Sequence, residues 1–127
     1  MGRNHERLRV FHEGHALVLA VYRHPQAFPR EEWFGLRAQM RRAAVSVTCN
    51  VVEGNARGTT RDYLRFLHIA LGSSCELKYL VGLAEELGFV AGPEWTEVRN
   101  RCDSLVRQLQ RLVDRMETIA DNDRPAT

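Results

Sequence analysis

The sequence has very little lysine, few cysteines and no long apolar run. Nearly all of its 18 basic side chains are arginines, the exception being Lys78. Its cysteines, Cys49, Cys75 and Cys102, are odd in number and form no CxxC pair, which indicates reduced thiols packed as small apolar groups. The longest apolar runs fall far short of the roughly 20 residues that span a membrane, and residues 3–9 are too charged for a signal peptide. We therefore expect a soluble, cytoplasmic protein without a membrane segment.

Motifs of common catalytic and metal sites are missing as well. Di-metal helical bundles need Glu-x-x-His pairs, and no glutamate here is followed by a histidine three residues later. His12 and His15 have no third ligand nearby, and Ser73-Ser74-Cys75 has no histidine identifiably placed to activate it. The segment 54–58 lacks the lysine and the spacing of a phosphate-binding loop. These absences predict no enzyme activity, no cofactor and no bound metal.

Apolar residues recur at spacings of three and four in four segments, which predicts four helices in one domain, residues 1–127. The expected helices cover about 6–23, 31–54, 60–88 and 93–120. Three of their apolar stripes are Leu8, Phe11, His15, Val18 and Tyr22; then Trp33, Leu36, Met40, Ala43 and Val47; and, in the last helix, Val98, Cys102, Leu105, Leu109, Leu112, Met116 and Ile119.

Local signals place the boundaries of these helices. Pro25 cannot continue the first helix, Thr59 and Asp62 form a capping-box pattern, Gly88 suits a helix C-cap, and Pro93 suits a first helical position. Residues 45–51 alternate apolar and polar side chains as a strand would, but a lone strand would have no pairing partner, so we prefer a helix. Short connections then predict an all-α, antiparallel up-down-up-down four-helix bundle with helices crossing at about 20°.

The third expected helix is apolar on two faces. One stripe runs at heptad spacing from Tyr63 to Leu87, and a second comprises Leu64, Leu67, Leu71, Ser74 and Val81. A helix in a single bundle needs one stripe of roughly 100°. The extra face indicates either a central position or a contact between subunits, and we favour self-association.

Charge is unevenly distributed: residues 35–65 hold six arginines against Glu53 and Asp62 and sum to +4, whereas residues 66–97 sum to −4. We expect a basic surface for RNA or DNA phosphate there, formed by Arg37, Arg41, Arg42, Arg57, Arg61 and Arg65. Because no aromatic interleaving or recognition motif accompanies them, binding should follow charge and not base sequence. An alternative is a structural polar network in which some of these arginines pair with Asn50, Glu53 and Glu76.

Several blocks of sequence, taken together and in order, are typical of one family. They are Pro29 to Glu32, Leu36-x-x-Gln39-x-Arg41-Arg42-Ala43-Ala44-Val45-Ser46, Asn50-x-x-Glu53-Gly54, Arg57, Tyr63-Leu64-Arg65-Phe66-Leu67, Ile69-Ala70-x-Gly72-Ser73, Glu76-Leu77 and Ala84-x-x-Leu87-Gly88-Phe89. With these blocks the chain resembles the small four-helix-bundle proteins encoded in intervening sequences of bacterial 23S ribosomal RNA genes. The resemblance covers roughly residues 8–115. This chain has Val51-Val52 where the family more usually has Ile-Ala, and the last helix matches by periodicity more than by identity.

This resemblance implies a bundle that assembles into a ring-like homo-oligomer, typically a pentamer. It also implies a relation to accessory proteins of diversity-generating retroelements, which partner a reverse transcriptase and nucleic acid. It implies no catalytic residue. We therefore expect a non-enzymatic, ring-forming bundle that binds RNA or DNA; the alternative is a scaffold that binds a protein such as a reverse transcriptase.

Overall fold

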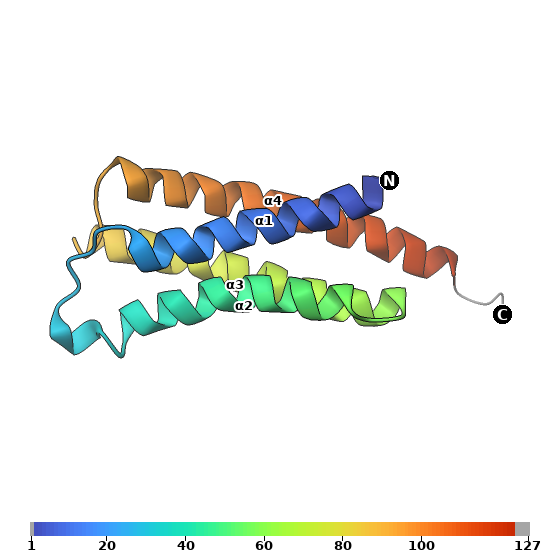
Figure 1. Ribbon diagram of the computed structural model, residues 1–127, viewed down its shortest axis with the longest axis horizontal. Helices are drawn as coiled ribbons and strands as arrows, with labels where there is room; N and C mark the ends of the chain where they lie inside the picture. Colours follow the sequence, from blue (N-terminus) through green and yellow to red (C-terminus); the bar gives the residue numbers. More distant parts are fainter. Residues whose placement is uncertain (1, 124–127) are drawn as a thin grey trace.

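The protein is a bundle of four α-helices (Figure 1). The computed structural model describes residues 2–123, with side chains from residue 5 onward. The helices are α1 (Gly2–Arg23), α2 (Leu36–Asn55), α3 (Thr60–Glu86) and α4 (Pro93–Asn122), and a short 3-10 helix, η1 (Arg30–Glu32), precedes α2. The described part of the chain contains no strand, and residues 45–51 lie inside α2, so the choice of helix for that segment is confirmed.

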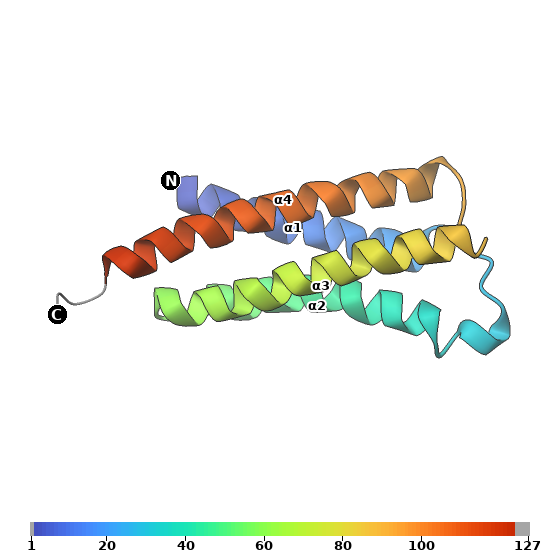
Figure 2. The ribbon, with the colours of Figure 1, turned by 180° about the vertical axis from the view of Figure 1, so that it is seen from behind.

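The bundle is elongated, and its two ends differ in which connections they carry (Figures 1 and 2). One end holds the α2–α3 connection, residues 56–59, together with the start of α1 and the end of α4; we call it the α2–α3 end. The other end holds the connections 24–35 and 87–92; we call it the α1–α2 end. The two ends of α2 therefore carry different chemical groups.

The core is continuous along the bundle, and α3 contributes both of its apolar faces to it. Leu67, Leu77 and Val81 are fully buried, and α3 packs against α2 on one side and α4 on the other. A central position in the bundle thus accounts for both stripes within one chain. The predicted stripe of α4 is also confirmed, since all of its members from Val98 to Met116 are buried and Ile119 is half-buried.

The predicted stripe of α1 is wrong at three of its five positions, whereas Phe11 and Val18 are half-buried and pack against the core. Leu8 and Tyr22 are 57% and 45% exposed, and His15 is also exposed. The apolar side chains that α1 buries are Val10, Leu17, Ala20 and Val21.

The buried face of α1 passes through Gly14, which a search for apolar spacing overlooks. A Cβ atom at Gly14 would lie 2.8 Å from Oγ1 of Thr48 on α2. Real Cβ atoms do not come that close, so glycine is what allows α1 and α2 to approach each other here.

The second helix begins at Leu36, about five residues later than the sequence indicates. The Glu32 carboxylate, at the end of η1, accepts a hydrogen bond from the Leu36 amide at 3.1 Å, which satisfies a free donor of the first turn. Trp33 therefore lies before the helix and outside the predicted stripe. Its indole donates a hydrogen bond to the Phe28 carbonyl at 3.3 Å, and its side chain is 42% exposed.

The other helix boundaries follow the predicted signals. The Thr59 hydroxyl accepts a hydrogen bond from the Asp62 amide at 3.1 Å, and α3 begins at the next residue after Thr59. Gly88 adopts a positive φ of 77° just after α3 ends, which glycine alone adopts without cost. Pro93 is the first residue of α4. A capping side chain, a glycine with positive φ and a proline therefore determine where these helices begin and end.

The cysteines differ in their surroundings. Cys102 is fully buried in the core, and burial raises the pKa of its thiol to about 12. Cys49 and Cys75 are exposed, so the expectation that all three pack as small apolar groups is wrong for these two. Separately, none of the described helices is long and apolar enough to cross a membrane.

Candidate nucleic-acid interface

The six predicted arginines do not form one surface. Arg57, Arg61 and Arg65 lie at the α2–α3 end, whereas Arg37 and Arg41 lie at the start of α2, at the α1–α2 end. Because a helix rises 1.5 Å per residue, Arg41 and Arg37, which lie 16 and 20 residues before Arg57, are roughly 24 and 30 Å from it along α2. The sixth, Arg42, follows directly after Arg41 and is exposed. The candidate interface therefore has two parts.

At the α2–α3 end, arginines contact an aromatic ring. The guanidinium carbon of Arg57 lies 4.6 Å from the centre of the Phe66 ring, and that of Arg65 lies 4.8 Å from it. Arg61 lies one turn before Arg65 on α3, and both side chains are exposed. We call Arg57, Arg61, Arg65 and Phe66 the Phe66 group.

The position of the Phe66 group depends on Gly54 in the last turn of α2. A Cβ atom there would lie 3.0 Å from Cδ1 of Tyr63 and 3.1 Å from Cβ of Phe66. The glycine thus lets the first turns of α3 pack directly on α2. Tyr63 is buried by this contact, and the guanidinium of Arg7, from α1, lies 4.0 Å from the centre of its ring.

Acids neutralise only part of this group. Arg57 forms an ion pair with Glu53 at 2.9 Å, one turn earlier in the chain. Arg61 and Arg65 form no ion pair with a residue that the structure describes. Their guanidinium N–H donors therefore remain available to an anion.

Arginines at the α1–α2 end also contact aromatic rings. The guanidinium carbon of Arg37 lies 5.1 Å from the centre of the Trp33 ring, and that of Arg41 lies 4.5 Å from the centre of the Tyr22 ring. The Nε atom of Arg41 is buried and has no hydrogen-bond partner. Arg42 makes no ion pair with the described residues.

These contacts between arginines and aromatic rings were not predicted from the sequence. Trp33 and Arg37 are four residues apart, but Trp33 lies before α2, so their contact depends on the turn that joins η1 to α2. Tyr22 and Arg41 come from different helices, and no sequence spacing relates them. Phe66 follows Arg65 directly, yet its contact with Arg57 depends on how α2 packs against α3.

The three polar residues proposed as a network make separate contacts. Asn50 donates a hydrogen bond to the Ser46 carbonyl at 2.8 Å, and the Ser46 and Ser73 hydroxyls lie 2.8 Å apart. Glu76 accepts a hydrogen bond from Gln39 at 3.3 Å, and Glu53 pairs with Arg57. None of these contacts involves Arg41 or Arg42.

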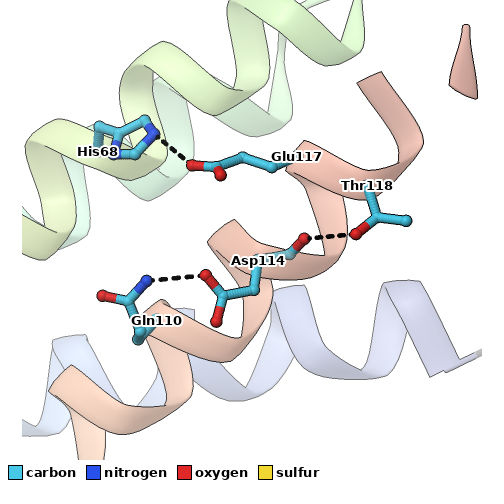
Figure 3. A network of polar contacts seen from close by, with 5 residues as sticks. All are labelled: His68, Gln110, Asp114, Glu117 and Thr118. Atoms are coloured by element: carbon cyan, nitrogen blue, oxygen red, sulfur yellow. Dashed lines mark hydrogen bonds and ion pairs between the residues drawn. The ribbon is translucent and has the colours of Figure 1, made fainter. Parts of the chain in front are cut away.

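Elsewhere the surface pairs many of its charges locally. On α4, Arg99 lies 3.3 Å from Glu85 and Arg101 lies 3.1 Å from Glu97. Figure 3 shows a further set between α3 and α4, in which His68 and Glu117 lie 3.1 Å apart. In the same figure the Asp114 carboxylate and carbonyl accept hydrogen bonds from Gln110 and Thr118, at 2.9 and 3.1 Å.

The lysine on α3 is neutralised as well. The Lys78 ammonium lies 2.7 Å from an oxygen of Asp103, and this hydrogen bond raises the pKa of the lysine. Among the described side chains, no three histidine, cysteine or acidic residues gather as they would around a metal ion. The arrangement at both ends of α2 suits binding of an anion.

Comparisons with known proteins agree on the fold. The family model described as 23S rRNA-intervening sequence protein matches residues 6–111. A crystal structure from Bacteroides thetaiotaomicron, described as a protein with unknown function from the S23 ribosomal protein family, superimposes with a TM-score of 0.76. It is 16% identical in sequence, and the match covers 86% of this chain and 98% of that one. No curated protein matches the chain significantly.

Proposed function

This chain belongs to the 23S rRNA-intervening sequence protein family, and from that premise we propose that it is a non-enzymatic bundle that binds RNA or DNA through arginine contacts to phosphate. We further propose an up-down-up-down order of helices and assembly into a ring of identical subunits, a pentamer by the family resemblance. The proposal assigns the first contact with nucleic acid to the Phe66 group.

The observation that supports this assignment is how the Phe66 ring holds its arginines. The ring lies against the guanidinium groups of Arg57 and Arg65, at 4.6 and 4.8 Å. An aromatic ring attracts a guanidinium without occupying the N–H donors that a carboxylate partner would occupy. Arg65, and Arg61 beside it, can therefore bind phosphate oxygens without first losing a protein partner.

Assembly would multiply these contacts. Single arginine–phosphate contacts are weak in salt, but every subunit of a ring presents the same group, so the contacts of one nucleic acid add as avidity. Phosphate contacts position a nucleic acid without reading its bases. We therefore expect the Phe66 group to bind RNA and DNA of different sequences with similar affinity.

The experiment compares two pairs of arginines with the same spacing. Arg61→Gln/Arg65→Gln removes two charges from the Phe66 group on α3. Arg107→Gln/Arg111→Gln removes two charges, also exposed and four residues apart, from α4. Binding of a short RNA and a short DNA duplex is measured for each double variant over a series of salt concentrations.

If both arginines of the α3 pair contact phosphate, their removal lowers the salt slope on duplex DNA by about 1.8 for each subunit that contacts the duplex, because each contact contributes about 0.9. The α4 pair should leave the slope unchanged. An equal effect of the two double variants, or a wild-type protein that binds nothing at low salt, would contradict the proposal.

A second candidate function is a scaffold for a protein partner such as a reverse transcriptase. Exposed apolar side chains on α2 and α3 favour it: Val52 is 51% exposed, Ile69 45% and Tyr79 67%. Pull-down from the native host after nuclease treatment separates the two. A retained reverse transcriptase would favour the scaffold, and its loss would favour a nucleic-acid bridge.

A further inference from the structure

A cavity of about 290 Å³ lies at the α1–α2 end, between the last turn of α1, the connection 24–35 and the first turns of α2. Its walls carry two guanidinium groups, from Arg37 and Arg41, and the aromatic rings of Tyr22, Phe28 and Trp33. We call it the Trp33 pocket. Its lining also includes His24 and Gln26 but no acidic residue.

Positive charge in the Trp33 pocket is not neutralised from within. Arg37 and Arg41 form no ion pair among the described residues, and each guanidinium lies against a ring, of Trp33 and Tyr22 respectively. The Arg41 Nε atom is buried without a hydrogen-bond partner. An anion bound here would contact the outer guanidinium N–H groups of Arg37 and Arg41, because no carboxylate of the described residues pairs with them.

Aromatic surface is available next to this charge. Tyr22 is 45% exposed and Trp33 is 42% exposed, so each ring keeps part of its surface open to a ligand. The Trp33 indole is held by its hydrogen bond to the Phe28 carbonyl, and the Phe28 ring in turn packs on Phe89 with ring centres 5.3 Å apart. The Arg30 guanidinium also lies 5.4 Å from the centre of the Trp33 ring, so a flat ligand would pack against the part of this ring that stays exposed.

A nucleotide combines the two properties that the Trp33 pocket would recognise, an anionic phosphate and a flat aromatic base. Small-molecule sites usually measure roughly 300 to 1,000 Å³, so this pocket, at the lower limit, has room for one nucleotide and not for several. Bases inside a duplex are paired and stacked, and they cannot enter without leaving the helix.

We infer that the Trp33 pocket binds one unpaired nucleotide of the nucleic acid, with its phosphate on Arg37 and Arg41 and its base against Trp33 and Tyr22. The inference rests on the proposed function, because the nucleotide belongs to the strand whose other phosphates contact the Phe66 group. It adds to that function a preference for single strands, or for duplexes with an unpaired end or bulge.

Trp33 provides a direct readout. The only other tryptophan, Trp95, is fully buried and donates a hydrogen bond to the Pro25 carbonyl at 2.8 Å. Its ring also lies 5.9 Å from that of His24, which lines the pocket, so loss of the quenching in Trp33→Phe is needed to assign the signal to Trp33. The probes are adenosine 5′-monophosphate, adenosine, inorganic phosphate and a single-stranded oligonucleotide. We expect saturable quenching by the monophosphate and the oligonucleotide, and binding at least about tenfold weaker for adenosine or phosphate alone.

Variants locate the binding. Arg37→Gln/Arg41→Gln should weaken oligonucleotide binding by at least about tenfold and leave binding of a blunt duplex nearly unchanged. The control Arg107→Gln/Arg111→Gln carries the same loss of charge and should bind the oligonucleotide as the wild type does. Because Arg41 is half-buried, Arg37→Gln alone serves as a second variant, and the thermal midpoint of each variant is measured to exclude unfolding.

The outcomes separate this inference from the proposed function. Loss of duplex binding in Arg61→Gln/Arg65→Gln without any Trp33 quenching by the oligonucleotide would overturn the Trp33 pocket and leave the proposed function standing. Quenching by the monophosphate but not by the oligonucleotide would overturn it in favour of a site for free nucleotides. Absence of all nucleic-acid binding would overturn both.

Discussion

Gly54 and Tyr63 are in direct contact, and a Cβ atom on Gly54 would lie 3.0 Å from Cδ1 of the Tyr63 ring. This contact sets how closely α2 and α3 approach at the α2–α3 end. Phe66 lies one turn further along α3 and would meet the same Cβ atom at 3.1 Å. The glycine thus determines where the Phe66 ring, and the arginines on it, are placed.

Gly54→Ala should therefore destabilise the protein by about 1–3 kcal/mol, because the added methyl group must push apart two well-packed helices. Gly72→Ala is the matched control: it also lies inside a helix, but nothing lies within 4 Å of its Cβ position. That variant should gain up to about 1 kcal/mol from helix propensity. Urea unfolding measures both, and equal effects would show that the Gly54 contact does not limit the packing.

Gly14→Ala should destabilise the protein through a different neighbour, Oγ1 of Thr48, by about 1–3 kcal/mol. Thr48→Ala in the same chain should restore part of that loss, because it removes the atom that the new methyl group would meet. The Thr48 hydroxyl is buried and lacks a hydrogen-bond partner, so its removal alone should cost little in hydrogen bonding. A double-mutant cycle measures the coupling, and simple additivity of the two changes would argue against the contact.

Phe66→Leu tests whether the ring orients the arginines for binding. The substitution keeps the net charge and an apolar side chain but removes the aromatic face, so duplex affinity should fall about two- to fivefold. The salt slope should stay the same, because the number of phosphate contacts does not change. A change in slope with no loss of affinity at low salt would contradict this role.

The buried thiol of Cys102 should make stability fall at high pH. Burial raises the pKa of Cys102 from 9.0 to about 12. Its contribution is complete below pH 9, where the thiol is protonated in both states. Above pH 9 the unfolded chain loses the proton first, so the free energy of unfolding drops by about 1.4 kcal/mol per pH unit until the folded thiol also ionises. In Cys102→Ala the free energy of unfolding should therefore fall less between pH 9 and 11 than it does in the wild type. Urea unfolding at a series of pH values measures the difference.

The cysteines should also differ in reactivity. Exposed Cys49 and Cys75 should react with a thiol reagent in the folded protein at pH 8, whereas Cys102 should react only when the protein unfolds. Counting modified thiols with and without urea, and repeating the count for Cys102→Ala, identifies the slow group. Rapid modification of all three in the folded state would mean that the core opens frequently.

The sequence predicted the buried face of a helix correctly where every buried position carries an apolar side chain. In α4 every buried position of the predicted stripe carries a side chain, so spacing alone identified the face. In α1 the buried face includes Gly14, which has no side chain, and the neighbouring series from Leu8 to Tyr22 gave a more regular but incorrect stripe. The start of α2 was placed too early from the sequence. The two acidic residues Glu31 and Glu32 looked like the first turn of the helix, but the Glu32 side chain instead accepts a hydrogen bond from the amide of Leu36, where the helix begins.

The same distinction applies to the candidate site. The contact of Trp33 with Arg37 depends on the turn between η1 and α2, because Trp33 lies before the helix that carries Arg37. The contact of Arg41 with Tyr22 requires the packing of α1 on α2, and the contact of Arg57 with Phe66 requires that of α2 on α3. Sequence identified the arginines, but it could not show which aromatic side chains they meet or that they occupy two ends of one helix.

The helix α2 fixes the distance between the Phe66 group and the Trp33 pocket. The distance from Arg41 or Arg37 to Arg57, roughly 24 to 30 Å along the helix, equals about seven to nine steps of a strand stacked at 3.4 Å each. A strand shorter than that can occupy one end of a subunit at a time, whereas a longer one can reach both. Affinity measured against strand length should then show a step at about this length, not a smooth rise.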